Sequence, residues 1–254
     1  LSKYNIKPEI IDQKRALPPV DLEFQGELRD YQIQAVHDVI QRAFGVLGAA
    51  TGSGKTVMAL AAIAERRQPA LVLVHNKELM YQWRDRIRSF LGIEPGLIGD
   101  GKFEIQPVTV AIVNSARKYL DSLPEHFGHI VVDECHRVPA TMFTEAVQAF
   151  DSKYMLGLSA TAYRRDGLTK LIYITLGDRV HQVDTDQLRA TGAVMSPEVI
   201  RRETDFRYTY QDDYTRMISN LTQDPDRNRQ IAADVIRQVR SRTGTALVVS
   251  DRVA

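Results

Sequence analysis

The sequence predicts an α/β domain whose mainly parallel sheet is flanked by helices. Three observations support this prediction: short apolar runs alternate with segments of helical periodicity, the runs are rich in β-branched residues, and a glycine-rich loop follows the first run and opens a helix. Such alternation is typical of βαβ units, in which helices cover a parallel sheet. We expect the domain to occupy residues 24–200, after an irregular lead-in over residues 1–23 that contains three prolines.

Each expected strand is short, and too apolar or β-branched to prefer an isolated helix. In chain order, the expected strands are residues 45–50, 70–74, 108–113, 129–133 and 154–159. Helices are expected in the intervals, at residues 55–67, 76–90 and 141–150. Asn76 and Thr141 open the last two, because their side chains can accept a hydrogen bond from the first helical turn.

After Ile200 the sequence becomes polar and aromatic, and we expect a second domain over residues 201–254. Within it, a helical stretch at 226–240 leads into TALVVS (245–250), which reads as a buried strand. One helix pair and one strand are too little to bury a core alone, so this piece either docks on the first domain or starts a truncated second lobe. Because the chain begins without a methionine and stops just after an apolar run, we expect it to be a fragment.

Composition and charge exclude several classes of protein. The chain has 254 residues, of which 44% are hydrophobic and 26% charged, as in an ordinary globular protein. No apolar run approaches the roughly 20 residues that a membrane helix needs. No leader peptide opens the sequence, so we expect a soluble, intracellular protein, cytoplasmic if it is prokaryotic. Its 33 basic and 32 acidic residues exclude a globally basic binder, so any polyanion site must be a local patch.

The sequence AATGSGKT (49–56) follows an apolar strand and opens a helix, which is the context that a phosphate-binding loop requires. Its glycines let backbone N–H groups approach phosphate oxygens, Lys55 meets the outer phosphates, and the Thr56 hydroxyl can bind magnesium. Ala49 stands where the usual pattern has glycine, and its small side chain should still permit the turn. The plainer alternative is a glycine-rich turn with a stray lysine. The residues expected to contact the nucleotide are Ala50, Thr51, Gly52, Ser53, Gly54, Lys55 and Thr56.

A second motif, VVDECH, ends an apolar strand, where a parallel sheet would bring its carboxylates beside the phosphates. Asp133 would then hold magnesium, and Glu134 would polarise the attacking water. Cys135 and His136 are adjacent rather than spaced as zinc ligands, and the chain has no second cysteine, which disfavours zinc and excludes an internal disulfide. We expect Cys135 to be a small buried filler, and His136 to pass a nucleotide-state signal through hydrogen bonds.

In order and spacing, AATGSGKT, VVDECHRV and GLSAT (157–161) resemble motifs I, II and III of superfamily-two helicases, here with a DECH box. The resemblance implies a RecA-like P-loop domain, a second RecA-like lobe, ATP and Mg²⁺ as cofactors, and catalytic roles for Lys55, Asp133 and Glu134. It also implies that Ser159 and Thr161 bond with motif II and couple hydrolysis to movement between lobes. Hydroxyls at a strand end can equally be caps.

The stretch LRDYQ (28–32) is similar to the adenine-reading segment of the same superfamily. The resemblance implies that Gln32 pairs with the adenine edge and that Arg29 or Tyr31 helps to hold the base. An amide can bond to adenine through two hydrogen bonds, so the chemistry suits this role. The alternative is an ordinary helix start.

The resemblance also places two segments, HNKELMYQW (75–83) and VNSARK (113–118), against the nucleic acid backbone. Short donors and cations at strand ends can reach phosphate oxygens, and a solvated helix face is the alternative for each residue. The spacing of Arg84, Arg86 and Arg88 puts them on several faces of one helix, which favours a solvated surface. The residues expected to contact nucleic acid here are Lys77, Asn114, Ser115 and Arg117.

The segment GLSATAYRRDGLTKLIYITLGDRVHQV, followed by LRATGAVMSPEV, resembles the branch of XPB-like DNA repair and transcription helicases. This resemblance implies DNA as the substrate, often as a duplex, and repair or transcription proteins as partners. That branch carries an Arg-Glu-Asp signature where this chain has Arg164, Arg165 and Asp166. The missing middle acid argues against a wedge-like unwinding role, although the two arginines can still contact phosphates or bases.

Together these inferences predict an ATP-dependent DNA helicase or duplex DNA translocase. The second lobe of such proteins supplies arginines to the γ-phosphate, and the chain ends before them, so we expect weak nucleotide binding and slow hydrolysis. A catalytically silent nucleic-acid-binding or adaptor domain is the alternative, against which the Lys55, Asp133 and Glu134 set argues. A small-molecule kinase would leave the SAT segment unexplained.

Overall fold

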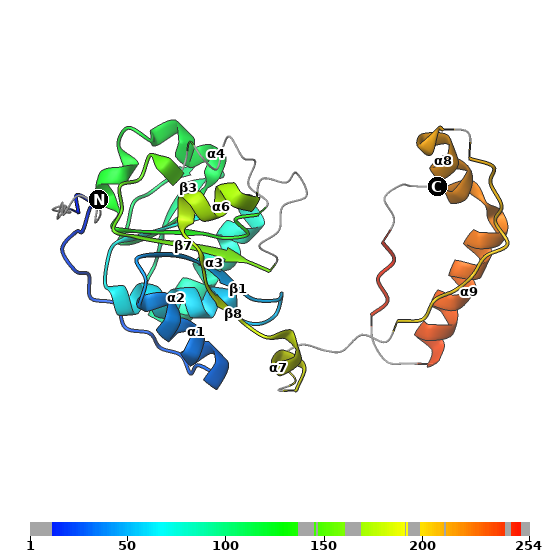
Figure 1. The fold of residues 1–254 in the computed structure, drawn as a ribbon, viewed down its shortest axis with the longest axis horizontal. Coiled ribbons are helices and arrows are strands. Elements are labelled where there is room, and N and C mark those ends of the chain that lie inside the picture. The colour runs from blue at the N-terminus through cyan, green and yellow to red at the C-terminus, as the bar shows by residue number, and fades with distance from the viewer. Residues whose placement is uncertain are drawn as a thin grey trace, which may run out of the picture. The chain divides into compact units, whose positions relative to one another are not determined.

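The computed structural model describes residues 12–136, 145, 147–160, 169–190, 192, 199–210, 212–241 and 245–249. The chain divides into two compact units, Leu1–Ser196 and Pro197–Ala254, each of which is described by itself (Figure 1). Among the described residues, no helix is both long enough and apolar enough to cross a membrane.

The first unit is built on a sheet in which the described strands have the order β4-β3-β5-β2-β6-β7-β1-β8. All neighbouring strands are parallel except β3 and β4, which form an antiparallel pair at one edge. The strands are β1 (Phe44–Gly48), β2 (Ala70–Val74), β3 (Gly96–Gly99), β4 (Lys102–Phe103), β5 (Val108–Ile112), β6 (His129–Val132), β7 (Tyr154–Ser159) and β8 (Arg179–Gln182).

Helices cover both faces of this sheet, and Figure 1 shows α1 and α2 on one side and α4 and α6 on the other. Alternate residues of β2 mark the two faces: Val72 and Val74 lie in the core cluster with α1, α2 and α3, whereas Leu71 and Leu73 lie in the cluster with α4 and α6. The helices and helical turns are α1 (Asp30–Ile40), α2 (Lys55–Arg66), α3 (Lys77–Leu91), α4 (Val113–Ala116), η2 (Arg117–Tyr119), η3 (Leu123–His126), α6 (Thr169–Leu176) and α7 (Thr185–Ala190).

The α/β prediction with a mainly parallel sheet is confirmed. Strands β2 and β7 occupy the predicted residues, and β1, β5 and β6 differ from prediction by one or two residues at their ends. Helix α3 begins as expected, because the Asn76 Oδ1 accepts a hydrogen bond of 2.9 Å from the Leu79 N–H. Of the predicted helix 141–150, Glu145, Val147 and Gln148 are helical, while its proposed cap Thr141 lies outside the described residues.

Three strands, β3, β4 and β8, were not predicted from the sequence. The first, GLIG, is half glycine, the second has only two residues, both exposed, and β8 (RVHQ) carries one aliphatic residue. None of the three shows the apolar run that marked the other strands. Their pairing with β5, β3 and β1, rather than their own composition, makes them strands.

The lead-in is irregular where it is described, with no helix or strand over residues 12–23 apart from an isolated parallel bridge between Arg15 and Ser152. The Arg15 guanidinium donates two hydrogen bonds, of 2.9 and 3.0 Å, to the Asp151 carboxylate.

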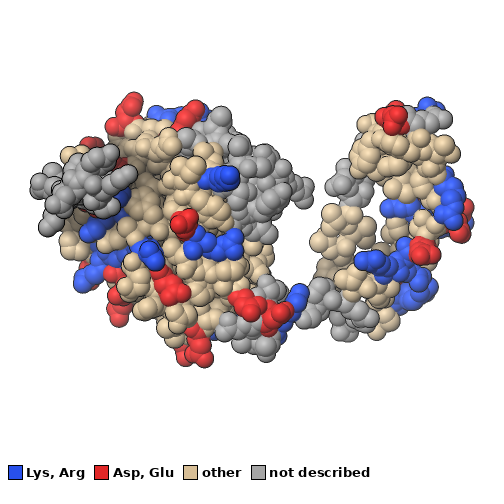
Figure 2. All heavy atoms as spheres, in the orientation of Figure 1, with Lys and Arg blue, Asp and Glu red and all other residues tan. Residues whose placement is uncertain are grey.

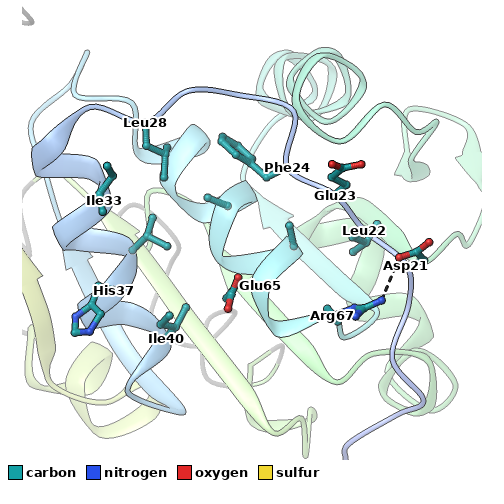
Figure 3. A pocket seen from close by; sticks show the side chains of 13 residues that line it. Asp21, Leu22, Glu23, Phe24, Leu28, Ile33, His37, Ile40, Glu65 and Arg67 are labelled. Carbon is teal, nitrogen blue, oxygen red and sulfur yellow. Dashed lines mark hydrogen bonds and ion pairs between the residues drawn. The ribbon is translucent and has the colours of Figure 1, made fainter.

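Further along, residues 21–28 cross the outer side of α1 and α2 and border an open groove of about 810 Å³ (Figure 3). No predicted site residue is among those that line this groove.

The second unit contains α8 (Tyr214–Gln223) and α9 (Pro225–Ser241), and α9 covers the predicted helix 226–240. The predicted buried strand at 245–250 is wrong over its described residues 245–249, which form no strand. Leu247 is 86% exposed and Val249 is 80% exposed. An apolar run becomes a buried strand only where neighbouring strands and helices cover it, and none of the described residues of this unit is buried.

Candidate nucleotide-binding site

The predicted site residues meet at the carboxyl edge of the parallel sheet. The phosphate loop follows β1, the DECH box follows β6, and Ser159 ends β7, which lies between those two strands. Backbone hydrogen bonds of 3.0 Å join the three segments: the Ala49 N–H donates to the Ser159 carbonyl and the Cys135 N–H donates to the Leu158 carbonyl. The topology therefore brings motifs I, II and III side by side.

The loop between β1 and α2 has the backbone of a phosphate cradle. Gly52 and Gly54 both have φ of 85°, in the left-handed region that favours glycine. Gly54 caps the N-terminus of α2, so the first N–H groups of that helix are available to an anion. Thr51 and Gly52 are exposed, whereas Ser53 is buried and its Oγ has no hydrogen-bond partner among the described residues.

Lys55 is the buried cation of the loop. The residue is only 9% exposed, and its Nζ donates to the carbonyls of Ala49 at 2.9 Å and Ala50 at 3.4 Å. Burial lowers the pKa of Lys55, while the nearby carboxylates of Glu134 and Asp133 oppose that shift. An ammonium held on neutral carbonyls gains when an anion arrives, which suits a phosphate-binding role.

Gln32 reaches the loop from the first turn of α1. Its Nε2 donates to the Ser53 carbonyl at 3.0 Å, and its Oε1 accepts from the Arg29 N–H at 3.0 Å. The Tyr31 hydroxyl donates to the same Ser53 carbonyl at 2.9 Å. Gln32 is buried, and both ends of its amide are engaged by the protein. The sequence predicted Gln32 at the site, but not that its amide holds the phosphate loop.

Asp133 is buried directly after β6, and each of its carboxylate oxygens accepts from one donor among the described residues. Its Oδ1 accepts from the Glu134 N–H at 2.9 Å, and its Oδ2 accepts from the Trp83 indole N–H at 2.8 Å. Burial raises the pKa of Asp133, and the hydrogen bond from Trp83 opposes this. Trp83 was not predicted as a site residue from the sequence. The only available signal was a lone tryptophan in an amphipathic helix, whose N–H needs a partner when it is buried.

Glu134 has a φ of 46°, in the left-handed region that is uncommon outside glycine. Its Oε2 lies 3.3 Å from the Nδ1 of His136, and the same nitrogen lies 2.9 Å from the Ser159 Oγ. His136 thus stands between the predicted water-polarising acid and the end of β7. Cys135 is fully buried in the core cluster with α4 and α6, as predicted, and forms no disulfide. Thr161, the other predicted coupling residue, lies outside the described residues.

The predicted nucleic acid residues lie at the same sheet edge, after β2 and β5. Lys77, Asn114 and Arg117 are exposed and Ser115 is half-buried. Arg117 is not an isolated cation, because it forms an ion pair with Glu145. Predicted contacts Arg164 and Arg165 lie outside the described residues.

Two of the arginines expected to be solvated are paired at the surface of α3. The Arg84 Nε donates to Asp85 at 2.9 Å, and an Arg88 Nη donates to Glu94 at 2.7 Å. Figure 2 shows Lys, Arg, Asp and Glu interspersed over the visible face of the first unit, rather than a single basic stripe.

The donor set fits magnesium. Thr56 offers a hydroxyl at the start of α2 and Asp133 offers a carboxylate at the end of β6. Mg²⁺ keeps several waters and is commonly bound by one or two protein oxygens together with substrate phosphates, so it does not need a full protein cage. Among the described residues, no group of three or more His, Cys, Asp or Glu side chains forms such a cage.

Fold and site together define a RecA-like P-loop domain of the kind that superfamily-two helicases carry. A family model described as "Type III restriction enzyme, res subunit" matches residues 25–164, and the chain belongs to this family.

Similar proteins include helicases and translocases of the XPB group. The chain is 33% identical over 189 residues to the DNA 3'-5' translocase XPB2 of Sulfurisphaera tokodaii, an alignment that covers 73% of this chain and 43% of the relative. It is 31% identical to the DNA 3'-5' helicase XPB of Kineococcus radiotolerans, over 71% of this chain and 34% of the relative. The chain thus spans less than half the length of these curated relatives.

Solved structures share the fold at lower identity. The Sulfolobus solfataricus SWI2/SNF2 ATPase core in complex with dsDNA superimposes with a TM-score of 0.52 at 21% identity, covering 64% of this chain and 38% of that one. The UvsW helicase from bacteriophage T4 gives a TM-score of 0.53 at 19% identity, covering 70% of this chain and 73% of that one.

Proposed function

We propose that the protein is an ATP-dependent DNA helicase or duplex DNA translocase, and that this chain is its nucleotide-binding half. The observation that carries the proposal is the meeting of buried Lys55 with Asp133 and Glu134 at one sheet edge. A passive binding module needs no second acid beside the metal acid. The relatives are named as a DNA translocase and a DNA helicase, which favours DNA as the nucleic acid along which the protein moves.

In this proposal each loop residue has a defined task toward Mg-ATP. The N–H groups at the start of α2 bind phosphate oxygens, and Lys55 leaves its backbone carbonyls to neutralise the outer phosphates. Thr56 and Asp133 would hold magnesium, which would supply charge neutralisation on the phosphate oxygens. Glu134 polarises the attacking water, and His136 and Ser159 relay the state of the site to the end of β7.

The base is proposed to lie beside the start of α1. Gln32 already holds the Ser53 carbonyl, so pairing with adenine would use the remaining lone pair or the second N–H of the same amide. A bound adenine and an ordered phosphate loop would thereby stabilise each other. Either the exposed side chain of Arg29 or the buried ring of Tyr31 is the proposed support of the base.

We propose that DNA lies along the exposed ends of α3 and α4, with its phosphates on Lys77, Asn114, Ser115 and Arg117 and on the arginines at 164 and 165. For Arg117 such a contact requires the exchange of Glu145 for a phosphate. Because the visible face carries both signs of charge, the affinity should depend on this local patch. Repair or transcription proteins are the proposed partners.

The residues from 201 onward are proposed to start a second helicase lobe. One alignment supports continuity beyond the first unit: the match to the DNA 3'-5' helicase XPB of Mycobacterium tuberculosis, at 27% identity, covers 85% of this chain. The first unit, Leu1–Ser196, makes up less of the chain than that. Arginines from a complete second lobe accelerate phosphoryl transfer on the order of 10³-fold or more.

The test is nucleotide binding and hydrolysis by the chain and by its Glu134→Gln variant, with and without duplex DNA. We expect both proteins to bind Mg-ATP, and only the wild type to hydrolyse it, slowly and faster with DNA. Equal hydrolysis by the variant would remove Glu134 from its role. Absence of ATP binding by either protein would overturn the proposed function.

A further inference from the structure

Trp83 lies on α3, on the side of the sheet covered by α1, α2 and α3, and the residue is 1% exposed. Most of the indole is ordinary core, packed in the same cluster as Met80 and Ile87. The one polar atom of the indole, Nε1, donates a hydrogen bond of 2.8 Å to Asp133 Oδ2. Trp83 and Asp133 are 50 positions apart in the sequence. The bond joins a core residue directly to the carboxylate that is expected to bind magnesium.

The chemistry of this donor suits a metal carboxylate. An indole N–H donates a hydrogen bond but carries no charge, so it fixes the carboxylate without neutralising the negative charge that Mg²⁺ needs. Oδ1 is fixed by the Glu134 N–H at 2.9 Å. With both oxygens held, the plane of the carboxylate is set before any metal arrives, which is the usual task of groups behind a metal ligand.

The same bond ties the site to α3. Trp83 lies in a helix that begins at Lys77, at the carboxyl edge of β2, which is hydrogen-bonded to β6. Trp83 follows Lys77 by six residues, which corresponds to roughly 9 Å along the helix. A shift of α3 would therefore move the donor of Asp133, and a change at Asp133 would be felt by α3.

We propose that Trp83 is a positioning residue that orients the Asp133 carboxylate for Mg²⁺ and links it to α3. This inference rests on the proposed nucleotide site. Trp83 touches neither phosphate nor water in it; it acts through Asp133.

The first test measures binding of the fluorescent nucleotide mant-ADP by the 254-residue chain as a function of Mg²⁺ concentration. Trp83→Phe keeps an aromatic ring but removes the N–H donor. We expect this variant to bind mant-ADP normally without Mg²⁺, and to need about 10-fold or more Mg²⁺ for half-maximal enhancement of binding, as is usual when a partner of a metal ligand is lost. The matched control is Ile87→Val, which trims the same helix in the core without touching a polar group.

A double variant separates positioning from loss of packing. In a protein that already carries Asp133→Asn, adding Trp83→Phe should not change the Mg²⁺ dependence further, because the carboxylate is gone. A further loss of the same size in that background would show that Trp83 acts through packing and would overturn the proposal.

The wild type offers a second readout that leaves Trp83 in place, because Trp83 is the only tryptophan of the chain. With ADP bound, we expect Mg²⁺ to change the indole emission of the wild type and to leave that of Asp133→Asn unchanged. An unchanged wild-type emission on Mg²⁺ binding would overturn the inference.

The two proposals fail in different ways. If the wild type binds no mant-ADP with or without Mg²⁺, the proposed function fails. If wild type and Trp83→Phe bind it with the same Mg²⁺ dependence, the nucleotide site stands and Trp83 has no positioning role.

Discussion

Glycine at position 54 is required both by the backbone and by a neighbouring side chain. Its φ of 85° disfavours any residue with a Cβ, and a Cβ there would lie 2.4 Å from the Gln32 Nε2. Gln32 would have to move, and its hydrogen bond to the Ser53 carbonyl would be lost. The glycine therefore serves the loop and its attachment to α1 together.

We expect Gly54→Ala to weaken mant-ADP binding by about 10-fold or more, since a loss of 1.4 kcal/mol corresponds to a factor of 10. Gly101→Ala is the matched control, because Gly101 has a similar φ of 79° but a Cβ added there would meet nothing within 4 Å. It should cost about 1 kcal/mol of stability from backbone strain alone and leave nucleotide binding unchanged. Equal effects of both variants on binding would show that the contact with Gln32 is unimportant.

At this scale the sequence predicted residues that belong to contiguous motifs and missed those that act across the fold. Lys55, Asp133 and Glu134 were identified from short patterns, because their spacing along the chain reflects one loop or one strand end. The Trp83 contact was not foreseen, since it joins α3 to β6 through a pairing that only the folded sheet creates. The engagement of Gln32 with the loop depends in the same way on where α1 lies relative to α2.

The end of α2 and the starts of β6 and β7 meet at the sheet edge opposite the site, around a half-buried arginine and a buried histidine. The Arg66 guanidinium lies 4.5 Å from the Tyr154 ring centroid, and one of its Nη atoms lies 2.9 Å from the His129 Nε2. Burial lowers the pKa of Arg66 to about 10. Since arginine can only donate, His129 accepts through Nε2 and is neutral. Burial and the charge of Arg66 place the pKa of His129 well below its ordinary 6.5.

This junction predicts loss of stability in mild acid. Below pH 6.5 the unfolded chain binds a proton at residue 129 and the folded chain does not, so the free energy of unfolding falls by up to about 1.4 kcal/mol per pH unit. The stability that the folded state gains by keeping His129 neutral is fully present above pH 6.5 and is lost as the pH falls. Urea unfolding at pH 7.5, 6.5 and 5.5 should show a steeper loss for the wild type than for His129→Gln, whose amide can still accept from Arg66. If the free energy of unfolding depended on pH equally in the two proteins, this account would be contradicted.

Among elements, those with a strong signal of their own were predicted, and those defined by their neighbours were not. Every residue of β2 is buried, and its apolar sequence shows this directly. The residues of strand β8 are exposed or half-buried. The strand is held by pairing with β1 and by a contact with α1, in which the His181 Nδ1 lies 2.8 Å from the Asp38 Oδ2. Sequence periodicity reports burial, so an edge strand that is little buried leaves no such trace.

For the whole molecule, the change of texture along the chain placed the domain boundary after Ile200, and the structure divides the chain after Ser196. The apolar run at 245–249 shows why composition predicted the second unit less well than the first. Composition says that a segment can be buried, but burial requires partners, and the described part of this unit provides none for it. In the first unit, every predicted strand has a neighbour on each side and a helical layer on each face.

This difference predicts that the first unit carries the stability and the nucleotide site of the chain. All buried residues of the described part lie before residue 189, so removing residues 197–254 takes away no core contact within the first unit. Residues 1–196 alone should keep mant-ADP affinity and unfold within about 3 °C of the full chain, which corresponds to roughly 1 kcal/mol or less for a unit of this size. Residues 197–254 alone should show no cooperative thermal transition by circular dichroism, because their helices bury too little apolar surface to offset the ordering of the chain. A fall of the first unit's midpoint by about 8 °C or more would mean that the second unit stabilises it.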